Sequence, residues 1–187
     1  MGSRVRVPSA PPRREEEQQS KLRFLAALFR YSLFQKPKTM FLSIINGPNL
    51  NLLGKRCPEI YGSATFEDTL AEIRKDFNDY RIEYFQSNCE GELIDAIQRD
   101  GFNPDCLGIV INPGAYAHYS IAIADAIEAA PAPVIEVHIS NIHAREEFRH
   151  KSVTARAARG VVAGCGRDGY ALALLHLIRT ANSNQNA

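Results

Sequence analysis

The sequence is poor in cysteine and has no long apolar run, and both absences exclude classes of protein. Its four cysteines show no C-x-x-C spacing and are too sparse for a disulfide framework, so we expect reduced thiols in a cytoplasmic protein. The apolar stretch at residues 22–34 contains arginine and is too short to span a bilayer, which argues against a membrane protein. No internal repeat is visible.

A strong excess of one charge is also missing over most of the chain. The first 39 residues hold nine Lys or Arg against three Glu, whereas the rest hold 13 basic and 18 acidic residues. The larger part is therefore mildly acidic, which argues against nucleic acid as a partner. A length of 187 residues suits a single domain with a sizeable core.

The first 39 residues differ from the rest in composition. A Pro- and Arg-rich segment and a polar tract occupy residues 4–20, and neither can build a core. The only methionines are Met1 and Met40, and Met40 directly precedes the first apolar run. We interpret residues 1–39 as an extension outside the domain, either upstream of the native start or a leader. The domain then spans residues 40–180, and residues 181–187 form a flexible tail.

From residue 41 onward, short apolar runs alternate with amphipathic stretches. The runs expected to form buried parallel strands are 41–45, 82–85, 107–111, 134–137 and 161–163. The helical patterns are 65–78, 90–98, 119–129 and 168–178, the first with a Thr-x-x-Asp start at Thr65. This alternation predicts an α/β fold, namely a flavodoxin-like, doubly wound, five-stranded parallel sheet in a single domain.

Polar residues follow four of the predicted strands at the point where each strand ends. These segments, rich in Asn, His and Ser, are 46–51, 86–88, 112–118 and 136–141. Because the carboxyl ends of parallel strands meet at one edge of a sheet, we expect the segments to form a functional crevice. Capping and turn chemistry is the competing explanation for any one of them.

A glycine motif near the end of the chain supports a rival hypothesis. Gly164, Gly166 and Gly169 match G-x-G-x-x-G, and they follow an apolar run and open the last helix, as in a dinucleotide-binding module. The acidic residue expected about twenty positions later would fall beyond the chain, and no strand follows to complete the unit. We therefore interpret these glycines as close packing between a strand and a helix.

Four longer segments carry a more specific signal. They are NGPNLNLLG at 46–54, QSN at 86–88 with EGELID at 90–95, INPGAY at 111–116, and EVHISNIHAREEFR at 136–149. In this order and spacing the chain resembles the type II 3-dehydroquinate dehydratases over residues 41–178. The resemblance implies reversible dehydration of 3-dehydroquinate to 3-dehydroshikimate, in the shikimate or quinate pathway, without metal or organic cofactor. It also implies a flavodoxin-like subunit that assembles as trimers packed into a dodecamer.

Dehydration beside a ketone needs a base for an α-proton, stabilisation of the enolate, and an acid for the departing hydroxyl. Tyr61 is the candidate base. A phenol has an unperturbed pKa of about 10, so it needs a nearby cation to ionise at neutral pH. Arg56, five residues earlier in the same loop, is the candidate for that cation, and Arg149 could add to it. An apolar anchor with a wet hydroxyl is the structural alternative for Tyr61.

His138 is the candidate general acid. Since side chains alternate along a strand, Glu136 lies on the same face and could orient the imidazole and stabilise its protonated form. A lone strand histidine is often structural, but the glutamate partner and the strand-end position favour catalysis. Asn49 is a candidate hydrogen-bond donor on the enolate side, although asparagines in turns commonly bind only their own backbone.

The family resemblance implies a further set of residues that bind the substrate. They are Asn112, His118, the backbone amides of Ile139 and Ser140, and Arg149, with Asp125 reaching the site of a neighbouring subunit. Arg145 and Arg149 would share a face if residues 144–150 are helical, or they could belong to a solvated surface pattern. Gly114, Ala117 and Tyr119 lie where the resemblance leads us to expect Ala, Thr and Thr in many relatives, and we expect them to change the pocket around His118 without removing its imidazole.

Three alternatives stay open at this level. A non-catalytic binding protein would need the crevice but not Tyr61. A metal site built from His118, His138 and His143 is conceivable, but their spacing matches no dense ligand motif. A Schiff-base dehydratase would need a desolvated lysine, and the three lysines after Met40 lie in none of the predicted strands.

Overall fold

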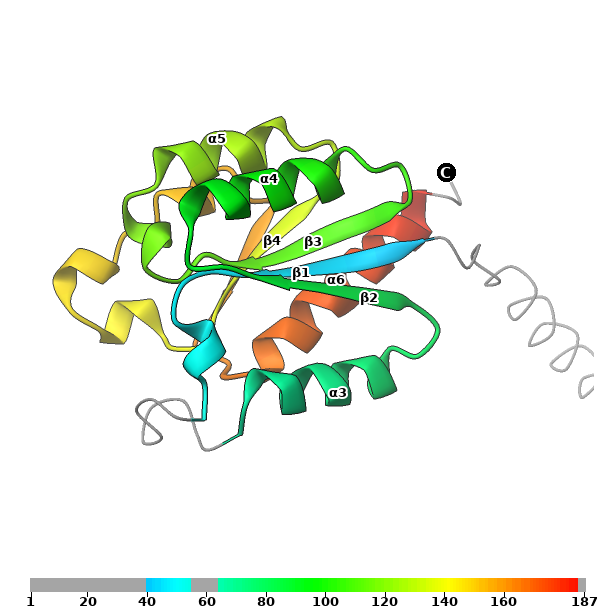
Figure 1. Ribbon diagram of the computed structural model, residues 1–187, viewed down its shortest axis with the longest axis horizontal. Coiled ribbons are helices and arrows are strands. Elements are labelled where there is room, and N and C mark those ends of the chain that lie inside the picture. The colour runs from blue at the N-terminus through cyan, green and yellow to red at the C-terminus, as the bar shows by residue number, and fades with distance from the viewer. Residues whose placement is uncertain (1–39, 55–63, 185–187) are drawn as a thin grey trace, which may run out of the picture. The chain divides into compact units, whose positions relative to one another are not determined.

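A five-stranded parallel sheet forms the centre of the protein in the computed structural model (Figure 1). The structure describes residues 40–54 and 64–184, which lie in one unit spanning residues 38–187. The strands are β1 (Phe41–Asn46), β2 (Arg81–Gln86), β3 (Cys106–Asn112), β4 (Val134–His138) and β5 (Gly160–Ala163). Their order is β2-β1-β3-β4-β5, with all neighbours parallel. This is the flavodoxin-like order, so the predicted fold class is confirmed.

Two helices cover each face of the sheet. Figure 1 shows α3 (Phe66–Asp76) and α6 (Asp168–Asn184) on one face, and α4 (Glu90–Gly101) and α5 (Ile121–Ala129) on the other. The helix α6 is longer than the pattern predicts, so residues 181–184, which we expected in a flexible tail, continue the helix. In the part of the chain that the structure describes, no helix is long and apolar enough to cross a membrane.

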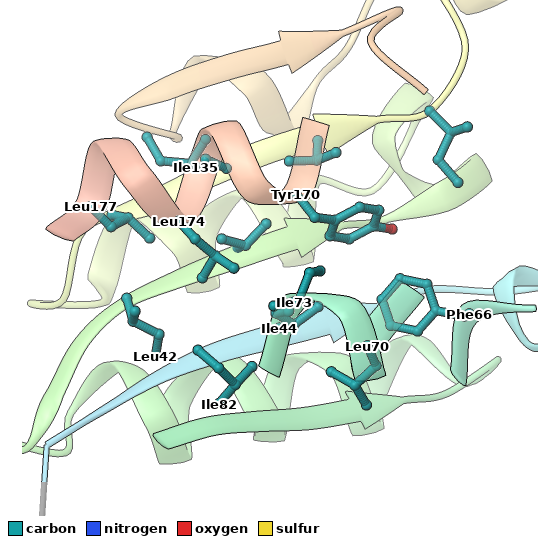
Figure 2. Packing of buried hydrophobic residues seen from close by; sticks show 14 of the residues in the cluster. Leu42, Ile44, Phe66, Leu70, Ile73, Ile82, Ile135, Tyr170, Leu174 and Leu177 are labelled. Carbon is teal, nitrogen blue, oxygen red and sulfur yellow. The ribbon is translucent and has the colours of Figure 1, made fainter. Parts of the chain in front are cut away.

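Side chains of β1 to β4 enter separate apolar clusters on the two faces of the sheet. Leu42 and Ile44 of β1 pack in the cluster that contains Phe66 of α3 and Leu174 of α6 (Figure 2). The neighbouring strand positions Phe41 and Ile45 belong to the other cluster, with apolar side chains of α4 and α5. Burying each Leu or Ile side chain stabilises the fold by about 1.5–3 kcal/mol. The sheet is therefore held rigidly from both sides.

Side-chain caps set the residues at which two of the helices begin. The hydroxyl oxygen of Thr65 accepts a hydrogen bond from the Asp68 N–H at 3.2 Å, and the Asp68 carboxylate accepts one from the Thr65 N–H at 2.9 Å. This is the capping box that the Thr-x-x-Asp pattern predicts. Ser120 caps α5 by accepting from the Ile123 N–H at 2.9 Å, so this helix begins after the expected Tyr119.

Short 3-10 helices occupy the connections at the carboxyl ends of the strands. They are η1 (Leu50–Leu52), η2 (Gly114–His118), η3 (Ile142–Ala144), η4 (Glu147–Arg149) and η5 (Thr154–Arg156). The loops after β1 and β3 approach each other closely at Gly47, where a Cβ atom would lie 2.4 Å from the Pro113 carbonyl oxygen. Only glycine fits at this position, and the approach fixes the two loops relative to each other.

The glycine motif between β5 and α6 serves packing, as we interpreted it from the sequence. A Cβ atom at Gly169 would meet Cγ1 of Val137 at 3.3 Å and Cγ1 of Val162 at 3.5 Å. The Gly164 N–H donates to the carbonyl oxygen of His138 at 3.1 Å. The strand β5 also lies at the edge of the sheet. The motif therefore seats α6 against β4 and β5.

Candidate active site

A polar pocket lies at the carboxyl ends of β1, β3 and β4, where the strand order reverses. Six predicted site residues line it, namely Asn112, His118, His138, Ile139, Ser140 and Arg149. Leu50, Gly114, Ile142 and Arg145 complete the lining. The expected convergence holds for three strand ends. The end of β2 contributes indirectly, because the Asn88 side chain accepts from the Asn49 N–H at 3.0 Å.

His138 and Glu136 form a buried hydrogen-bonded pair on β4. Nε2 of His138 donates to Oε1 of Glu136 at 2.7 Å, which is the contact that strand alternation predicts. The imidazole opens to the pocket, whereas Glu136 is fully buried behind it. Two hydroxyls, from Ser152 and Thr154, also donate to the Glu136 carboxylate, at 2.6 and 2.5 Å. The carboxylate is therefore enclosed by donors, an arrangement suited to holding an imidazole in one orientation.

A second imidazole faces the first across the pocket. The His118 ring lies 6.3 Å from the His138 ring, centroid to centroid, with 21° between the planes. Nδ1 of His118 lies 3.0 Å from the Lys151 carbonyl oxygen. A carbonyl oxygen only accepts, so Nδ1 carries the hydrogen and Nε2 of His118 is left for a ligand. The pocket thus offers two oriented imidazoles to one small molecule.

Asn112 is fixed by a tyrosine that the sequence reasoning missed. Nδ2 of Asn112 donates to the Tyr170 hydroxyl at 2.9 Å, and that hydroxyl donates to Oδ1 of Asn46 at 2.9 Å. The Gly114 N–H donates to Oδ1 of Asn112 at 3.2 Å. Burial of Tyr170 raises the pKa of its hydroxyl well above the usual range, so it acts as a neutral donor. The sequence did hold one indication that these two asparagines share a partner, because Asn46 and Asn112 end adjacent strands in register.

Arg145 and Arg149 bring positive charge to the pocket, although the single helix that would place them on one face is not formed. They lie in and beside two separate 3-10 helices, because Arg145 and Glu146 have extended backbone conformations. Their Nε atoms lie 3.3 and 3.1 Å from Oε2 of Glu146. A backbone hydrogen bond and both guanidinium charges lower the pKa of the Glu146 carboxyl. The two arginines thus converge on one carboxylate, a geometry that suits an anionic ligand.

Two predicted site residues do not line this pocket, and two others lie outside the described residues. Asn49 is exposed in a left-handed conformation with φ 68°, and it does not line the pocket. Asp125 is exposed on α5, 4.0 Å from Arg156, and it does not line the pocket either. Tyr61 and Arg56 lie outside the described residues.

The three-histidine metal site is not supported by the described part of the chain. No group of three or more His, Cys, Asp or Glu side chains there is arranged to hold a metal ion. His143 instead faces His150, with 6.2 Å between ring centroids. The imidazoles of the pocket are therefore better suited to proton transfer and hydrogen bonding than to metal coordination.

The fold and pocket together indicate an acid–base enzyme of the flavodoxin-like α/β class that acts on a small anionic molecule. Residues 40–178 match the family model described as dehydroquinase class II. The chain therefore belongs to the class II dehydroquinase family.

Relatives and solved structures agree with this assignment. The chain is 57% identical over 136 residues to a 3-dehydroquinate dehydratase of Caldicellulosiruptor bescii, covering 72% of this chain and 93% of that protein. It is 49% identical to that of Thermotoga neapolitana, covering 78% and 99%. The crystal structure of a type II dehydroquinase from Butyrivibrio crossotus superimposes with a TM-score of 0.71 at 48% identity, covering 74% and 97%.

Proposed function

We propose that the protein catalyses the reversible dehydration of 3-dehydroquinate to 3-dehydroshikimate by an enolate mechanism, in the shikimate or quinate pathway. The observation that carries the proposal is the buried His138–Glu136 pair facing a cationic strand-end pocket in a chain of the class II dehydroquinase family. The names of relatives at about half identity support the same reaction.

The first half of the proposed reaction removes a proton from the carbon beside the ketone. Tyr61, as a phenolate stabilised by Arg56, takes this proton, and the ketone becomes an enolate. Asn49 donates a hydrogen bond on the enolate side, directly or through water. The loop carrying Asn49 reaches the Asn88 side chain at 3.0 Å, which holds it at the carboxyl edge of the sheet.

The second half expels the hydroxyl group. Protonated His138 gives its proton to the departing hydroxyl, the electrons of the enolate form the new carbon–carbon double bond, and water leaves. Glu136 keeps the imidazole in place through the 2.7 Å hydrogen bond. In each turnover the phenolate therefore takes one proton from the substrate, and the imidazole gives one proton to it.

The remaining pocket residues bind the substrate. Arg149 and the backbone amides of Ile139 and Ser140 receive an anionic group, while Asn112 and His118 bind hydroxyls. Arg145, which the sequence left open, lines the same pocket and adds a second cation. Neither a metal nor an organic cofactor takes part in the proposed reaction.

An ultraviolet assay for the conjugated enone product tests the proposal. Purified protein with 3-dehydroquinate should give product, and Tyr61→Phe and His138→Asn should each lower kcat by about 100-fold or more. His176→Asn, on the exposed side of α6, is the matched control and should leave kcat unchanged. Borohydride with substrate should leave the enzyme active. Irreversible inactivation would instead indicate a Schiff base, and absence of product would refute the proposed reaction.

We also propose a homododecamer of four trimers in the cytoplasm, with Asp125 completing the site of a neighbouring subunit. The exposed position of Asp125 on α5 supports a role across an interface. Native mass spectrometry should show twelve chains, and Asp125→Asn should lower activity. A monomer with full activity would contradict both statements.

A further inference from the structure

The Glu136 carboxylate has no contact with solvent and is held by three hydrogen-bond donors. Nε2 of His138 donates to Oε1 at 2.7 Å, the Ser152 hydroxyl donates to the same oxygen at 2.6 Å, and the Thr154 hydroxyl donates to Oε2 at 2.5 Å. Thr154 is itself fully buried, and Ser152 is half-buried. The two hydroxyls come from η5 and the turn before it, well beyond β4 in the sequence.

Each hydroxyl has a single hydrogen, and the distances show where it points. Ser152 Oγ lies 3.4 Å from the Ala117 carbonyl oxygen but only 2.6 Å from Glu136, and it also accepts from the Ala155 N–H at 3.1 Å. Its hydrogen therefore goes to Glu136. Thr154 Oγ1 lies 3.3 Å from the Ser152 hydroxyl and 2.5 Å from Glu136, so its hydrogen goes there as well. The Glu136 carboxylate therefore accepts both hydroxyl hydrogens as well as the imidazole N–H.

The hydrogen bond to the Glu136 carboxylate fixes the tautomer of His138. The hydrogen of the neutral ring lies on Nε2, because the carboxylate only accepts. In the described ranges, Nδ1 of His138 has no hydrogen-bond partner within the protein. A second proton on the ring must therefore occupy Nδ1, and from there it can move to a substrate oxygen.

The same segment also positions the other imidazole. The Lys151 carbonyl oxygen accepts from Nδ1 of His118 at 3.0 Å, and the Val153 N–H donates to the Ala117 carbonyl oxygen at 2.7 Å. Residues 151–154 thus connect η2 to the end of β4. This one segment therefore sets the orientation of both imidazole rings that face the pocket.

We infer that Ser152 and Thr154 are positioning residues for the acid step, because their hydroxyls fix the Glu136 carboxylate, which in turn holds His138 with Nδ1 toward the substrate. This inference rests on the proposed function, since His138 acts as the acid there. Neither hydroxyl lines the pocket, so they act on the reaction through Glu136 and make no contact with the substrate.

Other charges near His138 make its titration a poor single test. Besides Glu136 on its own strand, the His118 ring on η2 and the guanidinium groups of Arg145 and Arg149 face the same pocket. A pH profile would therefore mix several groups. The effect of the two hydroxyls is isolated by measuring kcat and KM separately in variants that lack them. The proton resonance of the Nε2 hydrogen gives a second, independent measurement.

The test compares Thr154→Val, which removes the hydroxyl at nearly constant volume, with Thr154→Ser, which keeps it. Thr154→Val should lower kcat by about 10- to 100-fold with KM changed less than about threefold, and Thr154→Ser should restore most of kcat. Ser152→Ala should act in the same direction. Thr180→Val on α6, whose hydroxyl donates to the His176 carbonyl oxygen at 3.0 Å, is the matched control.

A spectroscopic measurement gives a reading without substrate. In protein labelled with ¹⁵N-histidine, the Nε2 hydrogen of His138 should give a far-downfield proton resonance that is absent in His138→Asn. Thr154→Val should shift this resonance or speed its exchange with water. Because no turnover is involved, the resonance reports on the hydrogen bonds even if the wild-type protein fails to dehydrate 3-dehydroquinate, which would refute only the proposed function.

The outcomes separate clearly. Unchanged kcat and an unchanged resonance in both Thr154→Val and Ser152→Ala would overturn the inference, as would an equal loss of kcat in Thr154→Val and Thr154→Ser. A rise in KM alone would also overturn it, since it would indicate a role in binding. If circular dichroism shows that Thr154→Val does not fold, then kcat and the resonance in Ser152→Ala decide whether the inference holds.

Discussion

Some residues of this site take part in the proposed chemistry, and others hold those residues in position. Tyr170 is a tyrosine near the pocket that does not act as a base, because burial keeps its hydroxyl neutral and both of its hydrogen bonds join asparagines. Its role is to hold Asn112, and through it the loop after β3. In our proposal the reactive tyrosine is Tyr61, which lies outside the described residues.

Removing the Tyr170 hydroxyl should therefore weaken both stability and binding. Tyr170→Phe removes the partner of Oδ1 of Asn46 and of Nδ2 of Asn112 at a buried position, which costs about 1–3 kcal/mol of unfolding free energy. KM should rise because Asn112 loses its anchor, while kcat changes less. Urea denaturation and steady-state kinetics measure these effects, and Tyr80→Phe, which lies before β2 and outside the pocket lining, is the control. Wild-type stability in Tyr170→Phe would show that the bridge is dispensable.

The cysteines should differ in reactivity according to their burial. Burial raises the pKa of the Cys106 thiol from 9.0 to about 11, whereas Cys89 and Cys165 are exposed. At pH 8.5, iodoacetamide should label Cys89 and Cys165 and spare Cys106, as read by peptide mass spectrometry. Rapid labelling of Cys106 in the native protein would contradict this assignment.

The same shift predicts a pH dependence of stability. Because the pKa is raised in the folded state, the contribution of Cys106 is complete below pH 9.0 and is lost as the pH rises toward 11, where the unfolded chain ionises first. The unfolding midpoint should therefore fall more steeply over this window in the wild type than in Cys106→Ala.

Among the elements, the close approach of the loops after β1 and β3 is the most demanding. In Gly47→Ala the new methyl group would lie 2.4 Å from the Pro113 carbonyl oxygen, and backbone atoms cannot rotate away. We expect a loss of about 1–3 kcal/mol or more and lower activity, since both loops border the pocket. Thermal unfolding and the enone assay measure the two effects.

Gly91 on α4 provides a matched comparison. No atom lies within 4 Å of a Cβ built there, so Gly91→Ala should be tolerated and stabilise the helix by up to about 1 kcal/mol. Equal effects of the two substitutions would show that the loop contact is less tight than the structure indicates.

The elements were largely predictable from the sequence, because each strand is a short apolar run and each helix has a periodic apolar face or a cap. The Glu136–His138 contact was predictable for the same reason, since alternation along β4 is local. Tyr170 and Thr154 were not, because their partners are 58 and 18 residues away, and only tertiary packing brings them together. The sequence left open whether residues 144–150 are helical, and they do not form one helix, because the backbone at Arg145 and Glu146 is extended.

For the whole molecule, the boundary at Met40 is a testable proposal. The family match begins at residue 40. A variant that starts at Met40 should keep the unfolding midpoint and the specific activity of the full chain. Differential scanning fluorimetry and the enone assay measure these quantities. A lower midpoint would show that residues 1–39 contribute to the fold.

The separation of the apolar interior into two clusters by the sheet has a practical consequence for protein engineering. Leu42 and Phe41 are neighbours in the chain, yet they point into different clusters. Effects of substitutions at distant, independent sites generally add. A thermostable variant can therefore be assembled from two libraries, one for each side of the sheet, which are screened apart and then merged with little epistasis between them.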